Sequence, residues 1–189
     1  MPNHQLQDVH PTVASLRSEI DRIDDALLDL VERRVAATTA IAALKDGEGE
    51  GRLKIRPRRE AEVVGRLTRR ARRAPPEMVG HLWRTIMSYG LQDQARMHLI
   101  LHGEGDRVAL QAAVRNRFGP APALRWASSE REALDVARRE EAVAIVARDG
   151  APDLADTPLR VFETVRVGDA NAYAIGRVAP ADIVEGAVA

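Results

Sequence analysis

The stretch LRSEIDRIDDALLDL, residues 16–30, decides the fold of the first half of this 189-residue chain. Its apolar residues recur at alternating intervals of three and four, which is the pattern of an amphipathic helix. The same spacing begins at Val13, and either Thr12 or Ser15 can cap the start. No glycine or proline interrupts the chain before the loop that follows Lys45. We therefore predict one helix from Val13 to Lys45.

The length of this helix has a consequence for association. A helix of about 33 residues is about 50 Å long at a rise of 1.5 Å per residue. It is too long to be buried inside one small domain. Such a helix needs an apolar partner along its whole length, so we predict that the chain self-associates.

The composition indicates a folded protein and excludes several classes. The chain has 28 basic and 28 acidic residues, and 45% of its residues are hydrophobic, so one or two packed domains are expected. A net charge of zero argues against a dedicated nucleic-acid binder. The absence of cysteine excludes a disulfide scaffold, a thiolate metal site and a cysteine nucleophile. The five histidines lack metal-ligand spacing, so we expect no metal site.

The sequence carries no sign of a membrane segment. No apolar run approaches the ~18 residues of a membrane span. The first residues, MPNHQLQDVHPTV, lack the basic and apolar regions of a signal peptide. We therefore expect a soluble cytoplasmic protein with no membrane partner.

The hydrophobic period changes near Met97, where we place a domain boundary. We expect a flexible N-terminus over residues 1–12 and an all-helical domain over residues 13–97. After a glycine-rich loop at residues 46–56, its second helix begins at Pro57 and ends near the basic run of residues 69–73, and its third helix covers about residues 77–96.

Residues 98–189 alternate between strand and helix patterns, which predicts a small α/β domain. The expected strands are 98–101, 124–126, 141–147, 159–167 and 172–178. The expected helices are 107–118 and a second one that ends near Arg139, opened by a capping box of Ser129 with Glu132. The predicted fold class is thus α + α/β.

Two basic residues of the first helix are spaced to act together. Arg34 and Lys45 are 11 positions apart, about three turns, so they share a face with Cα atoms about 16 Å apart. Two long side chains reaching toward each other could grip a small anion. Arg17 lies about 25 Å before Arg34 and cannot touch the same small ligand from the same helix. If Arg17 is functional, it must serve the site of another subunit.

Further candidates lie on the second and third helices. Arg59 and Glu60 follow the loop directly, and Gln94 lies one turn after Gly90, whose missing side chain leaves space for a ligand beside an amide donor. Each residue also has an ordinary explanation. Surface arginines are mostly solvated, and Lys45 or Glu60 could simply complement a helix dipole. Taken singly, none of these residues identifies a site.

Taken together, the ordered set resembles the all-helical, type II class of chorismate mutase. The resemblance covers residues 13–96, about half the chain. It implies an intertwined helical homodimer with two sites, each of which uses Arg17 from the partner subunit, in agreement with the distance argument. The parts that carry the resemblance are the pattern L-R-x-x-I-D-x-I-D-x-x-L-L-x-L at residues 16–30, Arg34, Lys45, Arg59, Glu60 and Gln94.

The reaction implied by the resemblance is the rearrangement of chorismate to prephenate in the shikimate pathway to phenylalanine and tyrosine. It is a pericyclic step that needs no cofactor and forms no covalent intermediate. The substrate is a small dicarboxylate, and negative charge gathers on the ether oxygen of its compact transition state. Such a site needs cations that hold both carboxylates and preorganised donors at the ether oxygen.

The resemblance also implies a role for each residue. Arg34 and the partner subunit's Arg17 hold the carboxylates. Lys45 and Gln94 donate to the ether oxygen, and Glu60 accepts from the ring hydroxyl. Some members carry a glutamate at the position of Gln94, which must be protonated to donate, so we expect this chain not to need low pH for that reason.

Three peripheral positions bear on substrate binding. Arg59 helps to bind the substrate's side chain or orients Glu60. Arg56 stands where the family often has an aspartate, and Gly90 stands where it often has a small hydroxyl residue. Both departures lie at the edge of the site, so we predict altered affinity rather than lost activity.

The second half resembles the beginning of a prephenate dehydratase domain. It has strand, G-x-G turn, helix, strand, capped helix and strand in that order. The Thr-Arg-Phe catalytic motif of the dehydratase does not occur in this sequence, and the region is about half as long as a dehydratase. We therefore interpret it as a reduced, non-catalytic or regulatory relative. The alternative is an unrelated small α/β domain that buttresses the dimer or binds a regulatory ligand.

Two other functions stay open for the whole chain. Isochorismate-pyruvate lyase uses nearly the same residues on a similar substrate, and the set from Arg17 to Gln94 does not separate the two enzymes. The chain could also be a helical dimerisation module with a ligand-sensing α/β domain and no catalysis.

Overall fold

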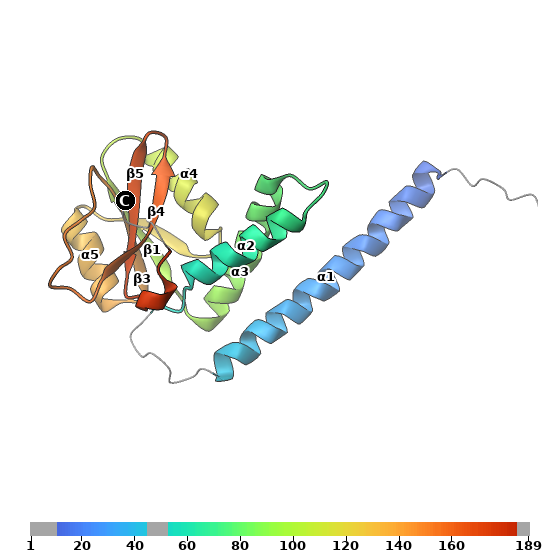
Figure 1. Ribbon diagram of the computed structural model, residues 1–189, viewed down its shortest axis with the longest axis horizontal. Coiled ribbons are helices and arrows are strands. Elements are labelled where there is room, and N and C mark those ends of the chain that lie inside the picture. Colours follow the sequence, from blue (N-terminus) through green and yellow to red (C-terminus); the bar gives the residue numbers. More distant parts are fainter. Residues whose placement is uncertain (1–10, 45–52, 185–189) are drawn as a thin grey trace, which may run out of the picture. The chain divides into compact units, whose positions relative to one another are not determined.

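The computed structural model describes residues 11–44 and 53–184 (Figure 1). Lys45, nearly all of the predicted N-terminal segment 1–12 and most of the predicted loop 46–56 lie outside the described residues. No helix within the described ranges is long and apolar enough to cross a bilayer.

Three helices occupy the first half of the chain. Their bounds are α1 (Val13–Leu44), α2 (Pro57–Arg70) and α3 (Pro76–Gln94). Thr12 caps α1, because its hydroxyl accepts from the backbone N–H of Ser15 at 3.1 Å while the Ser15 hydroxyl accepts from the N–H of Thr12 at 3.0 Å. Proline stands in the first turn of both α2 and α3, where its missing N–H costs no helical hydrogen bond.

The second half forms one mixed five-stranded sheet in the order β2-β1-β3-β5-β4. β1 pairs in parallel with both β2 and β3, whereas β5 pairs antiparallel with β3 and β4. Parallel neighbours need a crossover, which α4 (Arg107–Phe118) and α5 (Glu130–Arg139) supply. The strands are β1 (His98–Gly103), β2 (Ala123–Trp126), β3 (Ala142–Ala147), β4 (Arg160–Val167) and β5 (Ala170–Gly176), followed by a 3-10 helix, η1 (Pro180–Asp182).

The two crossover helices cover opposite faces of the sheet. Successive side chains of a strand point to opposite faces. Along β1, Leu99 accordingly lies in one buried cluster with Val114 of α4, and Ile100 lies in the other with Ala137 of α5. The result is a three-layer α/β/α arrangement whose central strands are buried on both sides. The α + α/β fold class predicted from the sequence is therefore confirmed.

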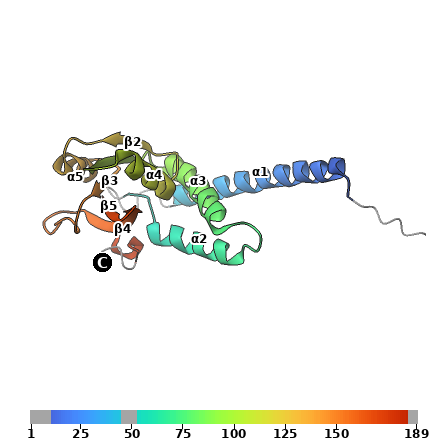
Figure 2. The same ribbon diagram turned by 90° about the horizontal axis from the view of Figure 1, so that it is seen from above.

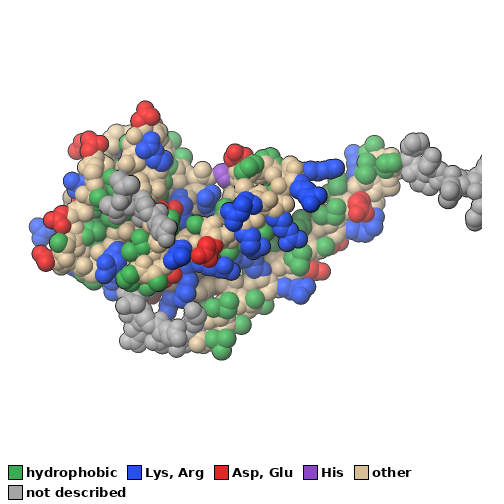
Figure 3. Space-filling view, viewed as in Figure 1, with side chains coloured by type: hydrophobic (Ala, Val, Ile, Leu, Met, Phe, Trp, Pro, Cys, Tyr) green, Lys and Arg blue, Asp and Glu red, His purple; other side chains and the backbone are tan. Residues whose placement is uncertain are grey.

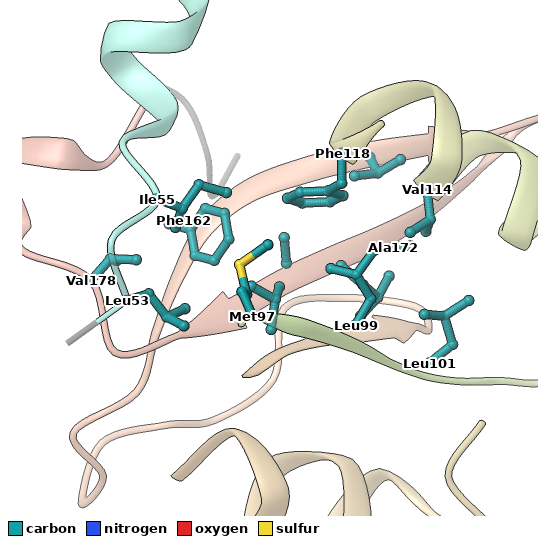
Figure 4. Packing of buried hydrophobic residues seen from close by; sticks show 14 of the residues in the cluster. Leu53, Ile55, Met97, Leu99, Leu101, Val114, Phe118, Phe162, Ala172 and Val178 are labelled. Atoms are coloured by element: carbon teal, nitrogen blue, oxygen red, sulfur yellow. The ribbon is translucent and has the colours of Figure 1, made fainter. Parts of the chain in front are cut away.

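The α2–α3 hairpin is attached to the sheet at both of its ends. Leu53 and Ile55, which precede α2, and Met97, which follows α3, lie with Phe162 in the core cluster on the α4 side of the sheet (Figure 4). The backbone N–H of Leu53 also donates to the carbonyl of Arg177 at 2.9 Å. The hairpin is consequently held by apolar burial on both sides of it.

The chain divides into two compact units, Met1–Ile41 and Ala42–Ala189. The first consists largely of α1, and the second contains the hairpin together with the sheet. The change in hydrophobic period near Met97 therefore does not separate compact units, because residues on both sides of Met97 share one core.

The ends of several elements differ from the predicted ones. α3 begins at Pro76 and ends at Gln94 rather than covering residues 77–96, and β5 begins at Ala170 and ends at Gly176 rather than covering residues 172–178. β5 ends there because the carbonyl of Arg177, the next residue, accepts from the chain that leads into α2 and not from a neighbouring strand.

The predicted capping box of α5 forms only in part. The Ser129 hydroxyl accepts from the N–H of Glu132 at 3.1 Å. The reciprocal bonds go to the preceding residue, since the N–H and hydroxyl of Ser128 donate to Oε2 of Glu132 at 2.7 and 2.5 Å. These hydrogen bonds from Ser128 lower the pKa of the Glu132 carboxyl.

The C-terminal end of α4 packs closely against α3 at Gly119. This glycine has a φ of +76°, and a Cβ added to it would lie 2.5 Å from the Ser88 hydroxyl oxygen. We predict that Gly119→Ala lowers the free energy of unfolding by about 2–4 kcal/mol, from backbone strain together with the clash. Gly150 has nearly the same φ, +73°, with open space around it. Gly150→Ala is therefore the matched control, expected to cost about 1–2 kcal/mol in a denaturant titration. Equal losses in the two variants would mean that the close approach of α3 and α4 is unimportant.

Candidate active site

Two of the predicted site residues, Arg17 and Arg34, lie on α1, among whose residues none is buried. Nearly all of one compact unit is α1, so these two arginines are placed only relative to each other along the helix. They are 17 residues apart, which corresponds to about 25 Å along the helix axis. Lys45 lies outside the described residues, so the predicted pair of Arg34 with Lys45 stays a prediction.

The start of α2 carries the next predicted residues. Arg56 immediately precedes the helix with its side chain exposed and makes no side-chain cap, while its carbonyl accepts from the N–H of Glu60 at 3.0 Å. The guanidinium of Arg59 lies 3.4 Å from the carboxylate of Glu62, with 67% of its side chain exposed. Arg59 is therefore directed toward solvent and not toward Glu60.

The end of α3 carries the last two predicted residues. Gly90 is buried and Gln94 is partly buried. The side-chain amide nitrogen of Gln94 donates to the carbonyl of Gly90 at 3.1 Å. The amide of Gln94 is thus turned back by one turn along its own helix, onto the backbone of Gly90.

The hairpin brings the start of α2 beside the end of α3, because a short turn joins two packed helices that run in opposite directions (Figures 1 and 2). Glu60 lies at this meeting point. A small cavity there is lined by residues of α2, α3 and α4 and of the segments that flank the hairpin. The lining residues are Ile55, Glu60, Arg84, Met87, Ser88, Leu91, Met97, Arg117 and Phe118.

Glu60 is held by an arginine of the α/β domain. Nη1 of Arg117, on α4, donates to Oε2 of Glu60 at 2.9 Å, and Nε of the same guanidinium donates to Oε1 of Glu163 on β4. The side chain of Arg117 is 12% exposed, and those of Glu60 and Glu163 are each 20% exposed. Charge-assisted hydrogen bonds shielded from water in this way are stronger and more directional than exposed ones.

Two glutamates and two arginines form a cluster of charges, which we call the ion cluster: Glu60 on α2, Arg84 on α3, Arg117 on α4 and Glu163 on β4. Burial acts to lower the pKa of Arg117, but Glu60 and Glu163 outweigh it and raise that pKa above its ordinary value. Burial and the neighbouring Arg117 lower the pKa of Arg84, against the opposing effect of Glu163 and Glu60. The formal charge of the cluster is zero, which is what a poorly solvated group of ions requires.

Neither Arg84 nor Arg117 is among the residues singled out from the sequence. A signal for Arg117 exists in the helical period. Leu110 and Val114 are buried on α4, and Arg117 lies seven and three positions after them, on the same face. An arginine on the apolar face of a helix needs a buried partner, but the sequence alone does not say which acidic residue provides it.

The surface around the hairpin is strongly basic. Figure 3 shows basic side chains gathered over α2 and the residues that follow it.

Within the described residues, no three histidine, aspartate or glutamate side chains are grouped so as to hold a metal ion.

The family of the helical segment follows from comparison with known proteins. Residues 16–95 match the family model described as chorismate mutase type II. This segment of the chain is therefore similar to the type II chorismate mutase family, in agreement with the resemblance noted for the first three helices.

A curated relative extends the similarity into the second half. The bifunctional chorismate mutase/prephenate dehydratase of Pseudomonas aeruginosa is 32% identical over 137 residues, which is 70% of this chain and 36% of the relative. The chain thus spans about a third of the length of that relative. The aligned part is longer than the helical segment, which confirms the resemblance of the α/β half to the relative's sequence. No solved structure matches this chain significantly.

Proposed function

We propose that this protein is a chorismate mutase, which rearranges chorismate to prephenate on the route to phenylalanine and tyrosine. The observation that carries the proposal is the ordered set of residues within the family segment: Arg17, Arg34, Lys45, Arg59, Glu60 and Gln94. Glu60 and Leu91, three positions before Gln94, line the same small cavity, which supports the proposal further.

The chemistry asks for positioning and charge, and not for a nucleophile. Chorismate must be held in the compact conformer that rearranges, and Arg34 with the partner subunit's Arg17 supplies cations for its two carboxylates. Binding both carboxylates at once removes most of the rotational freedom that opposes the reaction. Nothing in this step requires a cofactor.

The second requirement is stabilisation of the ether oxygen. Lys45 and Gln94 donate to it as the carbon–oxygen bond lengthens, and the charge that gathers there is stabilised by donors already in place. The amide of Gln94 has to leave the carbonyl of Gly90 or share its two protons between the carbonyl and the substrate. Glu60 accepts from the ring hydroxyl and so sets the orientation of the ring.

A second copy of the chain completes the proposed site. Nine large apolar side chains of α1 stay exposed, and on α3 Met78 and Leu82 are exposed as well. A helix with this many exposed apolar side chains needs an apolar partner, and an intertwined cytoplasmic homodimer with Arg17 contributed in trans fits the length of α1. The exposed side chains of α1 are Val13, Leu16, Ile20, Ile23, Leu27, Leu28, Leu30, Ile41 and Leu44.

The α/β domain has a supporting role in this proposal. The sequence contains no Thr-Arg-Phe triplet, so we assign it no dehydratase chemistry. Its core holds both ends of the α2–α3 hairpin. The domain therefore braces the helices that carry Glu60 and Gln94.

The decisive experiment is the loss of chorismate absorbance with the purified protein, with the product identified. We expect prephenate and no pyruvate. Pyruvate and salicylate formed from isochorismate would replace the proposal by isochorismate-pyruvate lyase. No turnover of either substrate would leave a helical dimerisation module with a ligand-sensing domain.

The neutral amide at Gln94 generates a prediction about pH. Gln94→Glu places a carboxyl group, with an ordinary pKa of about 4.3, where a donor is needed. We expect kcat/KM to fall about 100-fold or more at pH 7.5 and to recover as the pH falls toward 5, because only the protonated acid donates. Gln92→Glu, on the same helix, is the matched control. It removes a hydrogen bond to the carbonyl of Met97 and should leave the pH profile unchanged. A flat profile for Gln94→Glu would argue against contact with the ether oxygen.

The trans arrangement generates a prediction about mixed dimers. Arg17→Ala and Arg34→Ala should each reduce kcat/KM by about two to four orders of magnitude, since each removes a charge-assisted contact in a water-poor site. In a dimer of one chain of each kind, one site keeps both arginines. Mixing the two variants under conditions of subunit exchange should therefore restore one working site in each mixed dimer. Activity that stays at the level of the separate variants would contradict the shared site.

A further inference from the structure

We propose that Arg117, a residue of the α/β domain, is a positioning residue for the mutase site, where it holds the Glu60 carboxylate in the orientation that accepts the substrate's ring hydroxyl. This inference rests on the proposed function. It gives the second domain a defined part in the reaction, although no residue of that domain needs to touch the substrate.

The geometry of the guanidinium supports this role. Its nitrogens lie in one rigid plane, so a hydrogen bond at one edge fixes the direction of the others. Arg117 is anchored through Nε to Glu163 on β4, which directs Nη1 at Oε2 of Glu60. This hydrogen bond uses Oε2 of Glu60, and we assign the other oxygen, Oε1, to accept a hydrogen bond from the substrate's ring hydroxyl. The carboxylate is thereby oriented before a substrate arrives.

The position of α4 is itself fixed against the hairpin. Gly119 approaches Ser88 so closely that no side chain fits between them. The ring of Phe118 packs edge-on against that of Phe162 at 6.4 Å, and the guanidinium of Arg117 lies 4.8 Å from the centre of the Phe118 ring. These packing contacts hold Arg117 in a fixed position, as a positioning residue requires, whereas an exposed ion pair can change its geometry.

The charges around Glu60 come from three other elements. They are Arg117 on α4, Arg84 on α3 and Glu163 on β4. One oxygen of Glu163, Oε2, is buried and has no hydrogen-bond partner among the described residues. If Arg117 were removed, two carboxylates would face Arg84 alone, and the cluster would carry one excess negative charge.

A double-mutant cycle tests the proposal. We expect Arg117→Gln to lower kcat/KM for chorismate about 10- to 100-fold, the usual size of effect for a residue that orients a functional group. In the Glu60→Gln background the same change should cost less than about 3-fold, because Arg117 then has no carboxylate to position. Arg117→Lys should recover part of the loss, since an ammonium reaches one carboxylate without the fork of a guanidinium.

The separate values of kcat and KM give a second measurement that distinguishes positioning from a structural role. In Arg117→Gln, KM for chorismate should rise, because a misoriented Glu60 binds the ring hydroxyl less well, whereas a smaller folded fraction would lower only the apparent kcat. Arg115→Gln is the matched control. Arg115 lies two residues earlier on α4, and its guanidinium donates to the carbonyls of Pro120 and Pro122 at 3.1 and 2.6 Å. Arg115→Gln should lower the melting temperature without changing KM or kcat/KM at temperatures where the variant is folded.

The outcomes separate the two levels of inference. Equal losses of kcat/KM from Arg117→Gln in both backgrounds, with an unchanged KM in an active enzyme, would overturn the role of Arg117 and leave the mutase intact. No turnover by the wild type would overturn the proposed function and this inference with it. If circular dichroism shows that Arg117→Gln is unfolded, Arg117→Lys replaces it in the double-mutant cycle. Full activity of Arg117→Lys with Glu60 unchanged would then overturn the proposal.

Discussion

The burial of both ends of the α2–α3 hairpin in the core of the sheet is the constraint on which the second unit depends. Ile55 on one side and Met97 on the other pack with Phe162, so the hairpin cannot leave the sheet without exposing that cluster. Side chains at the start of α2 are consequently held at a fixed place relative to α4 and β4. The contact of Glu60 with Arg117 is a product of this apolar packing, because a charge pair by itself does not determine where two elements meet.

The ion pairs of this chain include exposed pairs and largely buried ones, and the two kinds differ in how strongly solvent weakens them. Arg59 and Glu62 lie in water, where hydration and side-chain freedom cancel most of their attraction. Arg117, in contrast, lies between Glu60 and Glu163 with only 12% of its side chain exposed, so solvent screens its charge much less. A chain with 28 basic residues thus uses few of them as fixed parts of its architecture. Position on a buried face distinguishes these few from the many.

The first unit follows different physics from the second. The sheet, its crossover helices and the hairpin bury their apolar faces against one another, whereas α1 buries no residue within the described chain. With so many exposed apolar side chains, this helix of 32 residues needs a second apolar surface to pack against. In the proposed enzyme, the sheet and the hairpin bury their own apolar faces, whereas α1 is stabilised chiefly by association with another chain.

The sequence by itself determined the order and type of the elements and the family that the first half resembles. The spacing of Leu16, Ile20 and Ile23 specifies a helix through local geometry. Short apolar runs of the second half, such as residues 142–147, indicate strands that are buried on both faces. Ends of elements and the partner of Arg117 were decided only in the tertiary structure. Periodicity shows that Arg117 faces inward, but Glu60 is 57 positions away, and pairing at that separation depends on how whole elements pack.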